Sequence, residues 1–124
     1  IDEVMASADV VSIHVPGGGS SHLINASHIA KLKPTAYLIN TARGDCVDQT
    51  ALIKALTENQ IAGAGLDVYT QEPNVPDELR KLDNVTLLPH IGSATVEVRT
   101  AMGMLAVDNL DAFFAGVTLP SKVV

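Results

Sequence analysis

Four polar residues in this sequence each follow a short apolar run and carry groups that can do chemistry: Arg43, Asp67, Glu72 and His90. An arginine guanidinium stays charged and can grip a carboxylate with two parallel hydrogen bonds. A histidine imidazole titrates near neutral pH and can both give and take a proton, and a nearby carboxylate favours its charged form. These residue types are suited to carboxylate binding and proton transfer.

Each of these residues also has a purely structural explanation. Arg43 could be a surface or helix-capping arginine, and Glu72 a solvated loop glutamate before a proline. His90 could be a core histidine with satisfied hydrogen bonds, and Asp67 a cap at a strand end, where an unpaired buried carboxylate would be costly. The spacing of these residues alone leaves the structural and the functional explanations open.

Four short apolar segments rich in Val, Ile and Leu predict the strands of a parallel sheet. They are residues 10–15, residues 37–41, a segment ending at residues 65–68, and residues 85–88. Near-continuous apolar strands are typical of a parallel sheet that is covered on both faces. In an open parallel sheet, ligands bind outside the carboxyl ends of the strands, which is where the four polar residues lie.

Helices are predicted in the gaps between the strands, as right-handed β-α-β units require. They are residues 1–8, a helix capped by Asn25 or Ser27 that ends near residue 32, a helix capped by Asp48 that runs to residue 56, and residues 94–115. Residues 77–82 predict a short turn. The last helix is the longest and has a mostly apolar stripe, and Gly116 ends it. The fold class is therefore α/β, a parallel sheet of about four strands with flanking helices and a long C-terminal helix.

The composition excludes several classes of function. The net charge of −6 and the lack of a basic stripe argue against nucleic acid and against an anionic membrane surface. No apolar run approaches the roughly 20 residues that span a bilayer. The chain begins at Ile1 and shows no signal peptide or basic leader, so we expect a cytoplasmic protein without a membrane partner.

The cysteine and the remaining histidines are expected to be structural. Cys46 is the only cysteine, which excludes an internal disulfide and favours a small buried residue in a reducing compartment. The four histidines lack the spacing of zinc ligands, so no metal is expected. His14 belongs to an apolar strand or its end, and His22 and His28 are expected on the surface.

The glycine clusters do not form the turn that opens a dinucleotide-binding fold. That turn has the pattern G-x-G-x-x-G between a strand and a helix. His22 stands where residues 17–19 would need their third glycine, and Val68 stands there for Gly63 and Gly65. We expect both clusters to serve the backbone, as a flexible loop over residues 17–21 and as a tight strand entry.

Five blocks of the sequence resemble the D-isomer-specific 2-hydroxyacid dehydrogenase family, in the family's order and with its spacing. They are ADVVSIHVP (residues 8–16), LINTARGD (residues 38–45), IAGAGLDV (residues 61–68), EP (residues 72–73) and LPHIGSAT (residues 88–95). Residues 100–116 look most like the glyoxylate/hydroxypyruvate reductase branch. The loop at residues 17–21 departs from the family, which usually has a loop containing Thr and Pro there.

The resemblance assigns roles to the polar residues. Arg43 would hold the substrate carboxylate and polarise the carbonyl, His90 would be the general acid and base, and Glu72 would pair with His90 and orient its ring. These three are the implied catalytic residues. The implied cofactor-binding residues are Val15, Pro16, Thr41, Ala42, Arg43, Asp67, His90, Gly92 and Ser93.

The resemblance implies an oxidoreductase segment that transfers a hydride between NAD(P)H and a small 2-oxo or 2-hydroxy acid, such as glyoxylate or hydroxypyruvate. The choice between NAD and NADP stays open. Residues 1–116 would form the C-terminal part of a Rossmann-type dinucleotide-binding domain, and residues 117–124 a tail toward a substrate-binding domain. The isolated chain is expected to be inactive.

The missing glycine turn leaves an alternative open. The chain would then be a non-catalytic dinucleotide-binding or self-associating module, with a fold like that of the dehydrogenases. Because an incomplete sheet exposes an apolar edge, we expect self-association, as a homodimer or a larger assembly.

Overall fold

The structure is a computed structural model that describes residues 1–19 and 21–123 and divides into two compact units. The first unit is Ile1–His90 and the second is Ile91–Val124. The loop expected over residues 17–21 includes residue 20, which lies outside the described residues. Within the described ranges, no helix is both long enough and apolar enough to cross a membrane.

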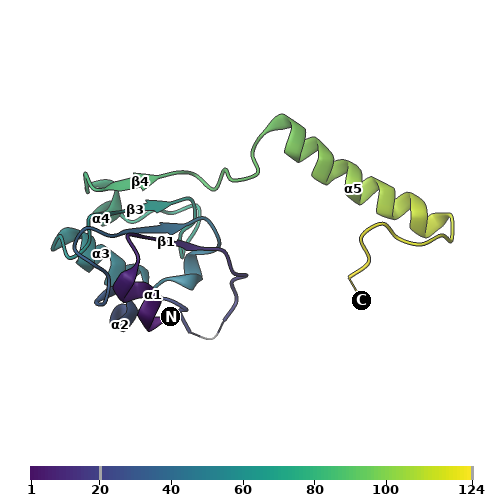
Figure 1. Ribbon diagram of the computed structural model, residues 1–124. Coiled ribbons are helices and arrows are strands. Elements are labelled where there is room, and N and C mark those ends of the chain that lie inside the picture. Colours follow the sequence, from purple (N-terminus) through teal and green to yellow (C-terminus); the bar gives the residue numbers. More distant parts are fainter. Residues whose placement is uncertain (20, 124) are drawn as a thin grey trace. The chain divides into compact units, whose positions relative to one another are not determined.

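The first unit is built on a four-stranded sheet whose described strands all run parallel, as the sequence predicted. Its strands are β1 Val10–Ile13, β2 Tyr37–Asn40, β3 Gly63–Leu66 and β4 Val85–Leu87, and they lie in that order across the sheet (Figure 1). The strands end earlier than predicted. One residue past the end of β3, the N–H of Asp67 still donates to the carbonyl of Asn40 at 3.0 Å. The chain leaves the sheet beyond this bond.

Of the four helices described in the first unit, the middle two begin at polar caps that the sequence predicted, the first begins at Ile1, and the last forms after Pro76, where only a short turn was predicted. The four are α1 Asp2–Ser7, α2 Ala26–Ile29, α3 Gln49–Thr57 and α4 Asp77–Arg80. Asn25, rather than Ser27, caps α2 by accepting from two backbone N–H groups, and Asp48 caps α3 through the N–H of Ala51. The second helix is shorter than predicted, because residues 30–32 continue as turns.

The helices cover one face of the sheet in the described part of the first unit, which corrects the expectation of cover on both faces. Strands taken in spatial order 1-2-3-4 with right-handed connections place every connection on the same side (Figure 1). The covered face packs Leu38 and Leu66 against Met5, Leu52 and Leu56, all of them buried. On the opposite face, Val10 and Tyr37 are 58% and 49% exposed.

The second unit is a long helix with a returning tail. Helix α5 spans Val96–Phe114, and Thr95 caps it by accepting from the N–H of Val98 at 3.2 Å. Gly116, with φ of 66°, lies just past its end, as predicted. The amide of Asn109 bonds both the hydroxyl and the N–H of Ser121, which ties the tail to the helix. The apolar stripe of α5 is mostly exposed within this unit.

Leu38 tests whether the covered face is the core of the first unit. It is fully buried in β2, so Leu38→Ala should lower the free energy of unfolding by about 2–5 kcal/mol through lost burial and a residual cavity. Val10→Ala, on the exposed face, should cost less than about 1 kcal/mol. Urea denaturation of both variants measures the difference, and equal losses would contradict this assignment of the two faces.

Candidate functional site

The carboxyl ends of the four strands bring the predicted site residues to one edge of the sheet. His14 follows β1, Arg43 lies three residues after β2, Asp67 follows β3, and His90 lies three residues after β4. Parallel strands have their carboxyl ends on the same side, which makes this arrangement a consequence of topology. The edge is therefore where chemistry on a bound ligand would take place.

Asn40 builds the loop that presents Arg43. Its side chain is buried at the end of β2, accepts the N–H of Ala42 at 3.1 Å and donates to the carbonyl of Arg43 at 2.8 Å. This short side-chain turn fixes the backbone on both sides of the arginine. The guanidinium of Arg43 is exposed and donates to the carbonyl of Ala42 at 2.7 Å.

His90 and Glu72 form the most direct contact between predicted catalytic residues. Nδ1 of His90 lies 2.6 Å from Oε2 of Glu72, with side chains 46% and 33% exposed. His90 has φ of 55°, in the left-handed region, which turns the chain sharply just after Pro89. This contact thus joins the loop before β4 to the segment after it, at the carboxyl-end edge of the sheet.

The pKa of the Glu72 carboxyl is lowered from its ordinary value. The hydrogen bond with His90 is the largest cause, and the backbone N–H of Tyr69, which donates to Oε1 at 2.9 Å, is the next. The charges of His90 and Arg43 act in the same direction, while partial burial opposes them. Glu72 is therefore an anion at neutral pH, beside the imidazole and within the field of the arginine.

A polar hollow of about 630 Å³ opens between the ends of β1 and β2. It is lined by His14, Val15, Pro16, Gly17, Gly18, Thr41, Ala42 and Arg43. Four of the predicted cofactor residues therefore share one hollow with the predicted carboxylate-binding arginine. Its size is that of a small-molecule site, and an apolar wall beside hydroxyl and guanidinium groups suits part of a dinucleotide. His14 borders this hollow and is exposed, and its Nε2 lies 2.7 Å from the hydroxyl of Ser12.

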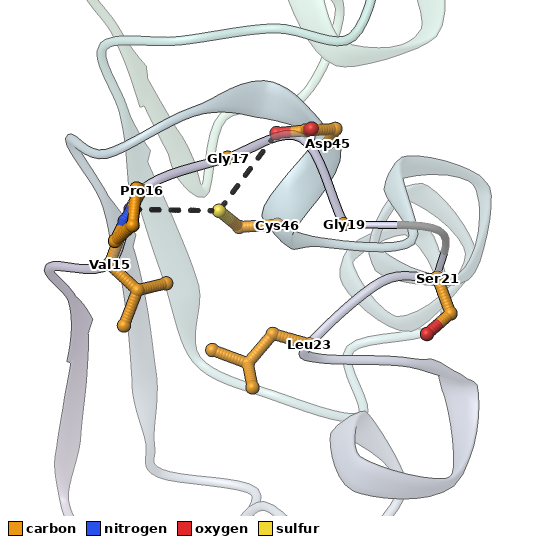
Figure 2. A pocket seen from close by; sticks show the side chains of 8 residues that line it. All are labelled: Val15, Pro16, Gly17, Gly19, Ser21, Leu23, Asp45 and Cys46. Atoms are coloured by element: carbon orange, nitrogen blue, oxygen red, sulfur yellow. Dashed lines mark hydrogen bonds between the residues drawn. The ribbon is translucent and has the colours of Figure 1, made fainter.

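A smaller hollow of about 290 Å³ is lined in part by the glycine loop, here meaning Gly17, Gly18 and Gly19 (Figure 2). Cys46 points into it from the 3₁₀ helix η1 (Gly44–Cys46), with its Sγ 4.0 Å from both the Val15 carbonyl and Asp45 Oδ1. Asp45 also accepts the N–H of Gly18 at 2.5 Å, so it ties the glycine loop to η1. Cys46 is buried, as predicted, and the 3₁₀ helix itself was not predicted.

The remaining predicted residues lie in different settings. Asp67 is buried directly after β3. Gly92 and Ser93 belong to the second unit and are exposed there. His22 is exposed, whereas His28 is only 19% exposed because its ring closes the capping box of α2. No cluster of metal-ligating residues occurs in the described ranges.

The sequence analysis missed two residues that organise the site, Asn40 and Tyr69. Asn40 is a polar residue at the end of a buried strand, and this unfavourable placement was a usable signal for a local hydrogen-bonding role. Tyr69 is one of two tyrosines, and its buried position three residues past β3 had no local signature. Both act on the backbone of the loops that carry the predicted catalytic residues.

The sequence of the first unit matches a known family. Residues 1–92 match the family described as D-isomer specific 2-hydroxyacid dehydrogenase, NAD binding domain. This chain belongs to that family. The family match and the observed sheet together confirm the α/β fold class and the NAD(P)-binding type of domain that the sequence predicted.

Relatives of known name are similar over nearly the whole chain. A glyoxylate reductase of Thermofilum pendens is 53% identical over 125 residues, covering 99% of this chain and 37% of that protein. A glyoxylate/hydroxypyruvate reductase of Arabidopsis thaliana is 52% identical over 103 residues, covering 83% of this chain and 33% of that protein. The chain therefore spans little more than a third of the length of these relatives.

A solved structure has the same fold. The crystal structure of an NADPH-dependent glyoxylate/hydroxypyruvate reductase of Sinorhizobium meliloti, in complex with NADP and malonate, superposes with a TM-score of 0.93 at 44% identity. The match covers 99% of this chain and 39% of that one.

Gly44 tests the close packing behind Arg43. A Cβ at this position would overlap the carbonyl group of Tyr69 and lie 2.5 Å from the N of Thr70. Gly44→Ala should therefore lower the free energy of unfolding by about 1–3 kcal/mol, because backbone cannot move aside as a flexible side chain would. Gly103→Ala is the control, since nothing lies within 4 Å of its added Cβ and a helical alanine should not destabilise. Chemical denaturation that finds both variants equally stable would refute the close contact.

The lowered pKa of Glu72 predicts a pH-dependent contribution to stability. A carboxyl whose pKa is lower in the folded chain stabilises the fold above its unfolded pKa, and this contribution is lost as the pH falls through the folded value. The stability advantage of the wild type over Glu72→Gln should therefore shrink as the pH is lowered from 7 to about 3. Urea denaturation at several pH values measures it, and an advantage that does not change with pH would contradict the prediction.

Proposed function

We propose that this chain supplies the carboxylate-binding and proton-transfer groups of an NAD(P)-dependent oxidoreductase that acts on small 2-oxo and 2-hydroxy acids. The observation that carries the proposal is the 2.6 Å contact between His90 Nδ1 and Glu72 Oε2, at the same sheet edge as Arg43. A protein that only binds a dinucleotide has no need of a histidine–carboxylate pair. The pair therefore favours catalysis over the non-catalytic alternative.

His90 would deliver the proton. Its Nδ1 faces Glu72, so Nε2 is the ring nitrogen that would face the oxygen of a bound 2-oxo acid. The protonated imidazole can donate as the carbonyl oxygen gains electron density, and the contact with Glu72 holds the ring in one orientation. In the reverse direction the neutral ring would accept the hydroxyl proton of the 2-hydroxy acid.

Arg43 would hold the substrate acid. Its exposed guanidinium can make two parallel hydrogen bonds to a carboxylate, and its fixed charge would polarise the adjacent carbonyl. The turn made by Asn40 limits the backbone freedom of Arg43, so less entropy is lost when the substrate is bound. The names of the relatives support acids as small as glyoxylate or hydroxypyruvate as the substrates.

The cofactor would occupy the hollow between β1 and β2. Val15, Pro16, Thr41 and Ala42 would line it, and Asp67, at the same edge of the sheet, would be a further contact. When bound, a reduced nicotinamide supplies the hydride for the carbonyl carbon. The 124 residues contain no G-x-G-x-x-G turn, so these contacts would hold one part of the dinucleotide and not its pyrophosphate. The relative from S. meliloti was crystallised with NADP and with malonate, a small carboxylate, which supports both kinds of ligand.

The cellular setting is also a proposal. A single buried cysteine suits a reducing cytoplasm. The exposed apolar residues on the open face of the sheet, Val10 and Tyr37 among them, support self-association.

A chimeric enzyme tests the catalytic roles. The matching 125-residue segment of the T. pendens glyoxylate reductase is replaced by this chain, and glyoxylate reduction is followed with NADH and NADPH. His90→Ala should lower kcat by about 10²- to 10⁴-fold, which is the usual contribution of general acid catalysis to the rate. Arg43→Gln should mainly raise KM for glyoxylate, because the carboxylate loses its charged partner.

The control is His28→Gln, which changes a histidine of helix α2 that lies in none of the proposed contacts. It should leave kcat and KM unchanged. An active chimera whose kcat survives His90→Ala would overturn the acid–base role. The same chimera with an unchanged KM in Arg43→Gln would remove the arginine from substrate binding.

A further inference from the structure

Tyr69 occupies a junction between the loops that carry the proposed catalytic residues. It lies three residues after β3 and is only 6% exposed, with its ring in the core of the first unit. Its hydroxyl lies 2.8 Å from the carbonyl of Leu88 and 3.2 Å from that of Leu66. A phenol has one proton, so the shorter contact, to Leu88, is the better placed to receive it.

The hydroxyl holds the chain at the point where the sheet stops. Beyond β4, the N–H of Leu88 still donates to the carbonyl of Leu66 at 2.8 Å. The hydroxyl of Tyr69 then donates to the Leu88 carbonyl, across the gap between the two strand ends. The segment is thereby fixed two residues before His90, where the chain turns with φ of 55°.

The backbone of the same residue holds the partner of His90. The N–H of Tyr69 donates to Oε1 of Glu72 at 2.9 Å, while Oε2 of Glu72 contacts His90. Gly44, next to Arg43, packs so closely on the peptide between Tyr69 and Thr70 that a Cβ there would overlap it. Three loops that arise from different strands therefore meet at one residue.

The phenol is suited to a permanent donor role. Burial raises the pKa of Tyr69, and the charges of Asp67 and Glu72 act in the same direction, against the opposing effect of the Leu88 hydrogen bond. Tyr69 therefore stays protonated across the neutral pH range, and the bond to Leu88 is available whatever the protonation state of the His90–Glu72 pair.

We infer that Tyr69 is a positioning residue, whose hydroxyl sets the geometry of the His90–Glu72 pair by anchoring the Leu88 carbonyl. The inference explains how the His90–Glu72 pair is held in place. It rests on the proposed function only for the claim that this pair takes part in catalysis. Tyr69 is not expected to touch substrate or cofactor, since its hydroxyl lies between backbone carbonyls of the core.

The test is Tyr69→Phe in the 124-residue chain, with the pKa of Glu72 read from the NMR signal of its carboxyl carbon. Without the hydroxyl, the segment that carries His90 should loosen and its bond to Glu72 should weaken. The pKa of Glu72 should then rise toward its ordinary value, by about half a unit or more. A tyrosine with a purely space-filling role would leave this pKa unchanged, because phenylalanine keeps the ring.

Tyr37→Phe is the matched control. Tyr37 lies in β2 with its ring 49% exposed on the open face of the sheet, so the loss of its hydroxyl should leave the pKa of Glu72 where it is. A folded Tyr69→Phe chain with an unchanged pKa of Glu72 would overturn the inference. An equal rise in both variants would also overturn it.

A second measurement uses the wild type and covers the case in which Tyr69→Phe does not fold. As the pH is raised until Tyr69 ionises, its phenol loses the proton that it donates to the Leu88 carbonyl. The ring signals of His90 should then move together with those of Tyr69 and not with those of Tyr37. If the ring signals of His90 do not change as Tyr69 ionises, the inference that Tyr69 anchors this segment is refuted.

The two proposals fail separately. A chimera that keeps its kcat in His90→Ala removes the catalytic role and leaves the NMR result standing. An unchanged pKa of Glu72 in Tyr69→Phe removes the anchor and leaves the acid–base role of His90 intact.

Discussion

The handedness of the strand connections is the constraint on which the rest of this structure depends. Four parallel strands follow one another across the sheet in sequence order, and right-handed connections then have only one side of the sheet available. The helices and the core must lie on that side, and all the carboxyl ends must share one edge. Residues as far apart in sequence as His14, Arg43 and His90 reach that edge for this reason.

The features predicted correctly from the sequence are those determined by local physics. Pro16 and Pro89 lie shortly after apolar runs, and Asn25 and Asp48 cap helices because their side chains accept backbone N–H groups. The strand order was not accessible in this way, because it depends on contacts between distant segments. The expectation of helices on both faces of the sheet was wrong for the first unit for the same reason. The residue pattern of a single strand does not tell whether helices cover one face or both faces of the sheet.

The site shows the same division between local and distant effects. Residue type at a strand end pointed to Arg43, Glu72 and His90, and the structure joins the last two directly. The side chains that hold the loops, Asn40 and Tyr69, act through backbone groups, and the partners of a backbone carbonyl are not encoded at any fixed spacing. Sequence reasoning therefore finds groups that can do chemistry more readily than groups that position them.

The proposed catalytic pair is held by contacts that do not involve a dinucleotide-binding glycine turn. The His90–Glu72 contact, the turn of Asn40 and the contacts of Tyr69 all lie within one compact unit. A Rossmann-type sheet forms its ligand crevice where the strand order reverses, and the order β1-β2-β3-β4 contains no reversal. The described strands can thus orient the proton-transfer pair by their own hydrogen bonds, before any contact with a pyrophosphate is made. In the proposed function, such a pair would already be organised when cofactor and substrate bind, so their binding energy would not be needed to assemble it.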